Sequence, residues 1–276
     1  MKFDDLDKKM RVYETVADYC VLPEMFIVTR LDGRNFTRLT KKTCDFDRPF
    51  DSRFRDLMAD TAASLMTCGF KVIYAYTESD EISLLFDRDE MSFARKLRKI
   101  NSIMAGHASA VFSLGIGQPA VFDCRVCQLP STQLVVDYFR WRNEDAARNA
   151  LSAWCYWTLR DSGRTQSEAT VDLVGLSTAE KNELLYKSGV NFNDLPAWQK
   201  RGVGLFWESF QKESMDPRNG RSVTAARRRI SRNFNLPMKD EYSEFVRSLV
   251  TGKDECPDNR HSLPTSSGAV SVPREP

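Results

Sequence analysis

Two acidic segments contain the residue types needed for metal-assisted phosphate chemistry. Asp32 follows an apolar stretch and precedes Gly33, so this point offers a carboxylate, a free carbonyl and several outward backbone N–H groups. Oxygen ligands of this kind suit Mg²⁺, and exposed amides at the start of a helix suit phosphate. The second segment is Ser79-Asp80-Glu81. Each segment alone has a simpler interpretation, because aspartate commonly caps helices and polar residues are common in turns.

Bringing Asp32 and Asp80 together changes that interpretation. Two adjacent carboxylates repel each other unless cations neutralise them. Two divalent ions about 3.5–4 Å apart are how polymerases stabilise the attacking and leaving oxygens of phosphoryl transfer. The pair therefore predicts a two-metal site, provided that the fold brings these distant segments to one place.

The order of the predicted elements supplies such a fold. Strands are expected at residues 26–31, 71–76, 82–86 and 120–128, and helices at 52–68 and 91–114. The order strand, helix, strand, strand, helix, strand is that of the ferredoxin-like arrangement. In it the first strand lies beside the hairpin, so Asp32 is expected near the turn at Asp80. We predict the α+β class, with a ferredoxin-like antiparallel sheet and its helices in residues 1–130.

The remainder of the chain has a different pattern. A helix is expected over residues 132–159, with a break near Arg142 and Asn143, and a capping box at Ser177 opens another that ends at Gly189. Probable strands follow at 202–209. We interpret residues 131–250 as a second, mainly helical domain. Residues 251–276 contain four of the eleven prolines and no aromatic residue, which predicts a disordered tail.

Charge is distributed unevenly. The 276 residues contain 40 Lys and Arg against 38 Asp and Glu, yet residues 217–238 include six arginines and no acid. Such a block predicts either a polyanionic partner or a solvated helix face. The arginines of this block are Arg218, Arg221, Arg227, Arg228, Arg229 and Arg232.

No stretch reaches the ~20 apolar residues of a membrane helix, the first residues are too charged for a signal peptide, and seven scattered cysteines fit reduced thiols. We expect a cytoplasmic protein without a membrane partner.

Three tryptophans, Trp141, Trp154 and Trp157, recur in the long helical segment. Their simplest interpretation is core packing between helices, because indoles bury large apolar areas.

Several strings in this chain resemble one enzyme superfamily in residue types, order and approximate spacing. They are Arg-Leu-Asp-Gly-Arg-Asn-Phe (30–36), Tyr-Thr-Glu-Ser-Asp-Glu (76–81), Phe-Asp-Cys-Arg-Val (122–126), Tyr-Phe-Arg-Trp-Arg (138–142), Lys-Asn-Glu (181–183) and Lys-Arg-Gly (200–202). Over about residues 3–235 the chain resembles the tRNA-His guanylyltransferase superfamily. The resemblance implies a polymerase palm-like catalytic domain in residues 1–130 and a tRNA-binding domain in residues 131–250. It also implies addition of nucleotides to tRNA 5′ ends in the 3′-to-5′ direction, and a homotetramer (a dimer of dimers).

The resemblance also implies roles for individual residues. It implies two Mg²⁺ ions held by Asp32, the Gly33 carbonyl and Asp80, with Ser79 and Glu81 completing the catalytic set. ATP and GTP or other nucleoside triphosphates would be the substrates. The implied nucleotide-binding residues are Arg30, Gly33, Arg34, Asn35, Phe36, Thr37, Arg48, Asp51 and Ser79. The expected tRNA-binding residues are Lys181, Asn191 and Arg201 from the resemblance, and Arg227, Arg228, Arg229 and Arg232 from the charge pattern.

One departure bears on the subclass. Where tRNA-His guanylyltransferases carry His-Ile-Asn-Asn-Leu-Tyr-Asn, this chain has Ala-Arg-Asn-Ala-Leu-Ser-Ala at 147–153, and only Asn149 and Leu151 persist. The pattern resembles the guanylyltransferase-like branch, which extends 5′-truncated tRNAs by copying a template, so we expect templated tRNA repair. The alternative is addition of one guanosine to tRNA-His. Two more distant alternatives are a nucleotidyl cyclase, disfavoured by the basic block, and a non-catalytic tRNA-binding protein, disfavoured by the intact aspartates.

Overall fold

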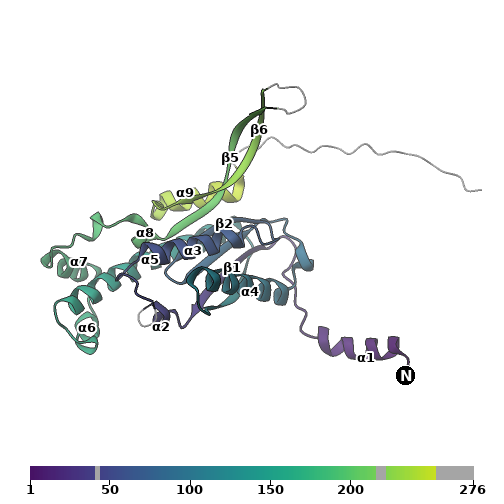
Figure 1. Cartoon of the computed structure of the whole chain (residues 1–276), viewed down its shortest axis with the longest axis horizontal. Coiled ribbons are helices and arrows are strands. Elements are labelled where there is room, and N and C mark those ends of the chain that lie inside the picture. Colours follow the sequence, from purple (N-terminus) through teal and green to yellow (C-terminus); the bar gives the residue numbers. More distant parts are fainter. Residues whose placement is uncertain (41–43, 216–221, 253–276) are drawn as a thin grey trace, which may run out of the picture.

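An antiparallel sheet forms the centre of the molecule. The computed structural model describes residues 1–40, 44–215 and 222–252. Within these ranges the sheet has six strands in the order β4-β1-β3-β2-β5-β6 (Figure 1). The strands are β1 (Phe26–Arg34), β2 (Val72–Glu78), β3 (Glu81–Phe86), β4 (Val121–Leu129), β5 (Val203–Met215) and β6 (Ser222–Asn233).

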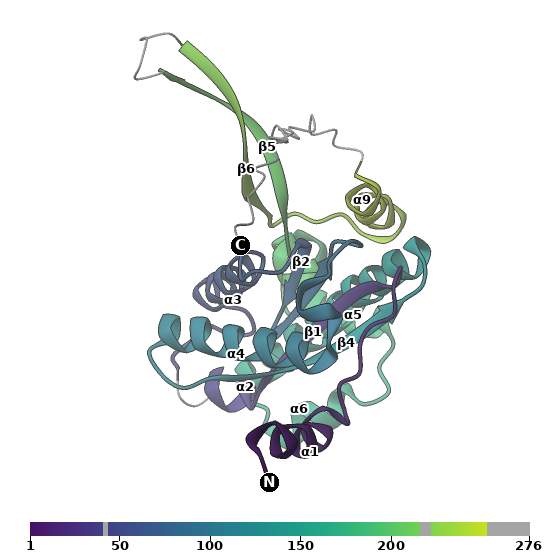
Figure 2. The ribbon, with the colours of Figure 1, turned by 90° about the vertical axis from the view of Figure 1, so that its right-hand side faces the viewer.

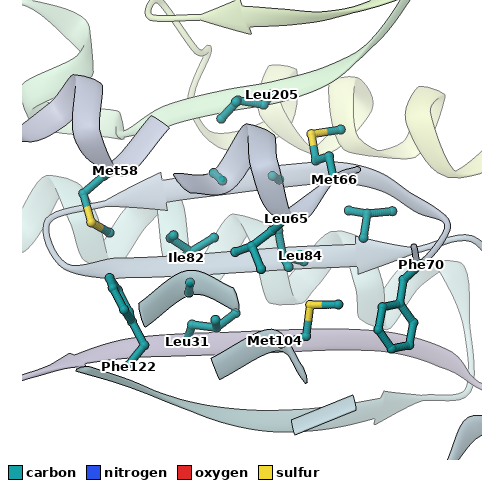
Figure 3. Close-up of a cluster of buried hydrophobic side chains, with 14 of the residues drawn as sticks. Leu31, Met58, Leu65, Met66, Phe70, Ile82, Leu84, Met104, Phe122 and Leu205 are labelled. Atoms are coloured by element: carbon teal, nitrogen blue, oxygen red, sulfur yellow. The ribbon is translucent and has the colours of Figure 1, made fainter. Parts of the chain in front are cut away.

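Helices cover both faces of the sheet. Helices α3 (Ser52–Leu65) and α4 (Leu97–Ile116) pack on one face, and α5 (Thr132–Asp161) and α9 (Lys239–Thr251) pack on the other (Figure 2). Because strand side chains alternate between faces, Ile27 and Leu31 join the α3–α4 core while Phe26 and Val28 join the α5–α9 core. Figure 3 shows Leu31 within the first core. Even-numbered β1 residues, including Asp32, therefore belong to the α5 face.

The predicted ferredoxin-like arrangement of β1, α3, β2, β3, α4 and β4 is confirmed. The single helix expected over residues 91–114 is wrong in detail: a 3₁₀ turn, η2 (Ser92–Arg95), precedes α4. Phe93, Ala94 and Arg95 have the positive φ angles that end a right-handed helix. The Arg95 guanidinium is buried and donates to the Met25 carbonyl, so tertiary contact overrides the helical pattern here.

Helix α5 runs without interruption, so the break expected near Arg142 and Asn143 is wrong. Arg142 is buried against Glu81 of β3, and the Asn143 side chain donates to the Arg201 carbonyl at 3.1 Å. Polar residues in the middle of this helix have partners far away in the chain. Their polarity is satisfied without unwinding the helix.

Short helices and a long hairpin follow α5. The helical elements are α6 (Gln166–Leu173), α7 (Thr178–Lys187), η3 (Phe192–Asp194) and α8 (Ala197–Arg201). β5 pairs with β2 only over Val203–Phe206, and the rest of the β5–β6 hairpin pairs with itself and projects from the body (Figures 1 and 2). The arginines at 227–232 lie on β6, so the alternative of a helix face is wrong. Arg218, Arg221 and nearly all of the predicted tail lie outside the described residues.

The N-terminal helix α1 (Phe3–Thr15) has no buried residue and lies away from the sheet (Figure 1), whereas the short α2 (Phe36–Arg38) follows β1 directly. Among the described residues, none of the helices has the length and apolar composition needed to cross a bilayer.

Candidate active site

The fold brings the two acidic segments to the same end of the sheet. Asp32 lies in β1 opposite Glu81 of β3, and Asp80 occupies the β2–β3 turn. The Gly33 amide donates to the Asp80 carbonyl at 3.0 Å, which joins the two segments directly. Ser79 is exposed in the same turn, and its hydroxyl donates to an Asp80 carboxylate oxygen at 3.3 Å. The predicted catalytic residues are therefore neighbours in space.

The electrostatics of this end of the sheet suit a cation. Burial raises the pKa of Asp80, and the nearby negative charge of Asp32 raises it further. No group of three or more Asp, Glu, His or Cys side chains forms a metal cage in the described parts of the chain. The available donors are two carboxylates and the Gly33 carbonyl, and oxygen donors of this kind fit a hard divalent ion.

Gly33 is required by its surroundings. A Cβ atom at this position would lie 2.4 Å from the Phe36 ring, which is closer than atoms can approach. Phe36 itself is buried among Phe54, Phe112 and Phe122. The Phe36 ring thus belongs to the core, so this residue offers a ligand its backbone and little of its side chain.

Arginines compensate the carboxylates on the α5 face. Arg125 of β4 donates to Asp32 at 2.5 Å, and the Arg30 guanidinium lies 3.4 Å from the same carboxylate. Arg142 of α5 binds Glu81 through two hydrogen bonds of 2.7 Å each. Burial raises the pKa of Glu81, and its pairing with Arg142 opposes that effect. Glu81 is thus fully engaged, which suits a positioning role.

Sequence analysis did not assign roles to Arg125, Arg142 or Glu78, although each lies in one of the family-like strings. Glu78 ends β2, and burial, reinforced by the charge of Glu81, raises its pKa to about 8. Their presence in these strings was a signal, but their ion pairs join segments that are distant in the sequence, so the local pattern does not show them.

A hollow of about 680 Å³ adjoins Asp80; we call it the nucleotide hollow. Its lining contains most of the predicted phosphate-cradling segment together with two aromatic residues of α5. The Arg48 guanidinium lies 4.5 Å from the centroid of the Trp157 ring, so Trp157 is a wall of the hollow and its expected role as core packing is wrong. The lining comprises Gly33, Asn35, Phe36, Thr37, Arg38, Arg48, Asp80, Tyr156, Trp157, Arg160 and Gln166.

Four predicted nucleotide-binding residues, Arg30, Arg34, Asp51 and Ser79, do not line the nucleotide hollow. Arg30 pairs with Asp32 on the α5 face, and Arg34 is exposed at the end of β1. Asp51 caps α3 by accepting from the Arg53 amide at 2.6 Å, and the Arg53 side chain lowers the pKa of Asp51 to about 2. Asp51 faces a separate cavity of about 130 Å³ that it shares with Ser79.

Two of the predicted tRNA-binding residues line a second hollow of about 740 Å³, which we call the basic hollow. Lys181 donates to Ser152 at 3.0 Å, and Arg201 donates to the Leu236 carbonyl at 2.9 Å. Among the described residues its lining adds Arg148, Lys200 and Lys239 but no carboxylate. Asn191 does not line it; its side chain instead caps η3 by accepting from the Asn193 amide.

The β6 arginines have acidic partners that the local sequence does not show. Arg229 donates to Glu208 across the hairpin at 2.8 Å, and Arg232 donates to Asp60 of α3 at 2.6 Å. The Arg228 guanidinium lies 5.1 Å from the Trp207 ring centroid. The interpretation of this block as lacking acidic neighbours is therefore wrong for Arg229 and Arg232.

A ferredoxin-like antiparallel sheet with two aspartates at adjacent strand ends and a hollow beside them defines a nucleotidyltransferase palm. The family model described as tRNAHis guanylyltransferase matches residues 7–130, and the one described as Thg1 C terminal domain matches residues 133–244. The chain belongs to the tRNA-His guanylyltransferase family, and it is a nucleotidyltransferase.

Relatives and solved structures agree with this assignment. A probable tRNA(His) guanylyltransferase of Mus musculus is 35% identical over 208 residues, which cover 71% of this chain and 69% of the relative. The Homo sapiens relative of the same description is 36% identical over 204 residues, covering 70% and 68%. A bacterial tRNA(His) guanylyltransferase (Thg1)-like protein in complex with GTP superposes with a TM-score of 0.67 at 27% identity, covering 90% of this chain and 99% of that one.

Proposed function

We propose that this chain adds nucleotides to the 5′ end of a tRNA in the 3′-to-5′ direction. The observation that carries the proposal is the position of Asp32 and Asp80 at one end of the palm, beside the nucleotide hollow. The names of the relatives favour one form of this reaction, the addition of guanosine to tRNA-His. The comparisons fit that alternative better than the templated repair expected from the sequence.

The reaction has two steps. The 5′-monophosphate of the RNA first attacks the α-phosphate of ATP, which gives a 5′-adenylylated end and releases pyrophosphate. The 3′-hydroxyl of the incoming nucleoside triphosphate then attacks the activated 5′-phosphate, loses its proton and expels AMP. A 5′-triphosphate end would enter at the second step and release pyrophosphate.

The residues of the site have distinct tasks in this scheme. The backbone amides of Asn35, Phe36 and Thr37 and the Arg48 guanidinium would bind the phosphates of the nucleotide. Asp32, Asp80 and the Gly33 carbonyl would hold two Mg²⁺ ions. When bound, these ions would acidify the attacking hydroxyl and stabilise the charge that develops on the phosphate. Arg142 fixes Glu81 beside this centre.

Basic surfaces would bind the RNA backbone. Arg227 and Arg228 on the hairpin, with Lys181 and Arg201 at the basic hollow, are the residues best placed to contact phosphates. Arg229 and Arg232 would contribute less, because each already pairs with a carboxylate. A homotetramer that grips tRNA across subunits stays a prediction.

Templated extension of 5′-truncated tRNA is the second candidate, and one observation favours it. Ser152 and Ala153 stand where the family motif has tyrosine and asparagine, and both line a hollow of about 590 Å³ together with Asp80. Small side chains at these positions leave space next to Asp80, as a template strand would require.

One assay separates these reactions. The protein is incubated with Mg²⁺, ATP and all four nucleoside triphosphates, and with 3′-labelled RNAs: tRNA-His lacking its extra guanosine, and a second tRNA lacking its first nucleotide. Guanosine addition to tRNA-His alone supports the first candidate, and template-matched lengthening of the truncated tRNA supports the second. Unchanged RNA of both kinds, or a cyclic nucleotide product, would contradict the proposal.

A further inference from the structure

Trp141 is exposed to an unusual degree. The chain has five tryptophans, all within the described ranges, and Trp141 is the most exposed of them, with 53% of its surface accessible. The expectation that it packs in the core is therefore wrong. Its exposed neighbours on α5 are mostly polar, including Asp137 and Arg148, and Leu134, two turns away, is the other large apolar side chain exposed on this helix.

The ring is held in a fixed orientation by the active-site network. The Arg142 guanidinium lies 4.7 Å from the Trp141 ring centroid and is itself pinned by both oxygens of Glu81. Tyr138 meets the indole edge to face at a centroid distance of 5.9 Å, and its hydroxyl hydrogen-bonds with Ser83 at 3.0 Å. A preorganised ring loses little conformational freedom when a ligand stacks on it.

Trp141 and the nucleotide hollow lie at different points along α5. Trp157, a wall of that hollow, lies on the same helix about 24 Å farther along at the usual rise per residue. Glu81 contacts Arg142 next to Trp141, and Asp80 lines the hollow with Trp157. The carboxylates thus lie between two aromatic surfaces on α5, and two substrates must meet at the carboxylates.

The charged groups around Trp141 favour contact with a base over contact with a phosphate, since Asp137 and Asp145 lie four residues away on either side along α5. Arg142 holds the indole and also binds Glu81, which faces Asp32 across the β1–β3 pairing. Arg125, with 53% of its side chain exposed, reaches the same Asp32. Because Arg142 is buried and both arginines already pair with carboxylates, the indole ring is the group left to contact an RNA, and bases stack on aromatic side chains in single-stranded nucleic-acid sites. A protein partner would favour a continuous apolar patch, which this part of α5 lacks.

We propose that Trp141 is a stacking subsite for the nucleobase at the 5′ end of the RNA, the end that carries the reacting phosphate. The subsite rests on the proposed function and adds to it a binding position for the second substrate. It places the RNA end on the Trp141 side of the carboxylates and the free nucleotide on the Trp157 side. Trp141 acts as a positioning residue, because its ring holds the base and not the reacting phosphate.

The test uses an RNA hairpin with 2-aminopurine as its first, unpaired 5′ nucleotide, without nucleoside triphosphates. Stacking quenches the fluorescence of 2-aminopurine. Wild-type protein and Trp141→Phe should quench it, whereas Trp141→Ala should not, and should bind this hairpin about tenfold more weakly, as expected for the loss of one stacked base. Tyr186→Ala, which removes another exposed aromatic side chain on α7, is the matched control and should behave as wild type.

The outcomes distinguish the subsite from the proposed function. If only Trp141→Ala loses the quenching, the subsite is supported, whether or not the wild-type protein adds a nucleotide. Failure of the wild-type protein to add a nucleotide would contradict only the proposed function. Equal quenching by wild type and Trp141→Ala overturns the subsite. A changed oligomeric mass of Trp141→Ala in sedimentation also overturns it, because another copy of the chain would then cover the ring. In the extension assay, Trp141→Ala should raise KM for RNA about tenfold and leave kcat nearly unchanged.

Discussion

The group of Asp32, Asp80 and Glu81, which we call the carboxylate site, and the β5–β6 hairpin use arginine in opposite ways. At the carboxylate site, Arg142 is buried with 7% of its side chain exposed and binds Glu81 through two hydrogen bonds. On the hairpin, Arg229 is paired with Glu208 but 62% of its side chain is exposed. A buried pair is insulated from solvent, whereas an exposed pair is screened by salt.

This difference indicates what each region is built to do. The buried arginines fix carboxylate positions within a rigid sheet, which suits chemistry that depends on geometry. The exposed arginines can exchange an internal partner for an external anion at little cost, which suits binding to an RNA backbone. Substitutions in the two regions should therefore differ in the size of their effect and in their response to salt.

The largest expected effect is on catalysis. Asp80→Ala should lower the single-turnover rate of nucleotide addition to a 5′-triphosphorylated RNA by about a thousandfold or more, because a metal ligand is lost. Asp123→Ala is the matched control: Asp123 lies opposite Asp32 in β4, and 66% of its side chain is exposed. We expect less than a tenfold change for it, and an Asp80→Ala rate within tenfold of wild type would refute the metal assignment.

The next effect is on stability. Arg142→Met should lower the free energy of unfolding by about 3–5 kcal/mol, because it leaves the buried Glu81 carboxylate with only the Arg30 guanidinium, 3.8 Å away, as a cationic partner. Arg125→Met removes an ion pair whose arginine is half exposed, and should cost less than about 1 kcal/mol. Urea denaturation measures both. The double variant Glu81→Gln/Arg142→Met should recover part of the loss, and equal losses for the two single variants would contradict the comparison.

A smaller, pH-dependent effect is expected at the cap of α3. The pKa of Asp51 is lowered in the folded protein to about 2, so its contribution to stability is complete above about pH 4 and is lost as the pH falls towards 2. Asp51→Ala should cost about 1 kcal/mol at pH 7, with a difference from wild type that shrinks between pH 4 and 2.5. Asp51→Asn keeps a capping oxygen and should cost less. Urea midpoints at each pH check this, and a pH-independent difference would contradict it.

The smallest effect concerns the hairpin. Arg227→Ala should weaken tRNA binding a few-fold and lower the slope of log Kd against log salt concentration by about one, because one phosphate contact is lost. Arg229→Ala should change the slope less, since Glu208 already pairs with that charge. Filter binding at salt concentrations from about 50 mM to about 200 mM measures both slopes. Identical slopes for wild type and both variants would exclude the hairpin from the RNA contact.

The meeting of Asp32 with Asp80 was predictable because it follows from the order of local patterns. The strands, their turn and the helices between them are encoded by hydrophobic periodicity, and the topology then places the two segments side by side. Arginine favours helices locally, so the strand conformation of residues 227–232 was not predictable; it depends on pairing with β5. The continuity of α5 at Arg142 likewise depends on Glu81, a partner distant in sequence.

The roles of aromatic residues were harder to predict for a similar reason. The spacing of Trp141, Trp154 and Trp157 on one helix favours burial, but α5 extends beyond the sheet, so its later turns face the hollows instead of the core. Only Trp154 packs against a small buried cluster, with Leu151 and Leu185. Local sequence gives the helix, and tertiary structure decides which of its faces is covered.

The most direct test of the account is a crystal structure of the protein with Mn²⁺ and a non-hydrolysable GTP analogue, with data collected at the manganese absorption edge. The account predicts anomalous peaks between Asp32 and Asp80, within about 2.2 Å of oxygens from both carboxylates, and a triphosphate in the hollow lined by Arg48 and Trp157. Peaks absent from this position, or carboxylates that turn away from each other around a well-ordered nucleotide, would contradict it.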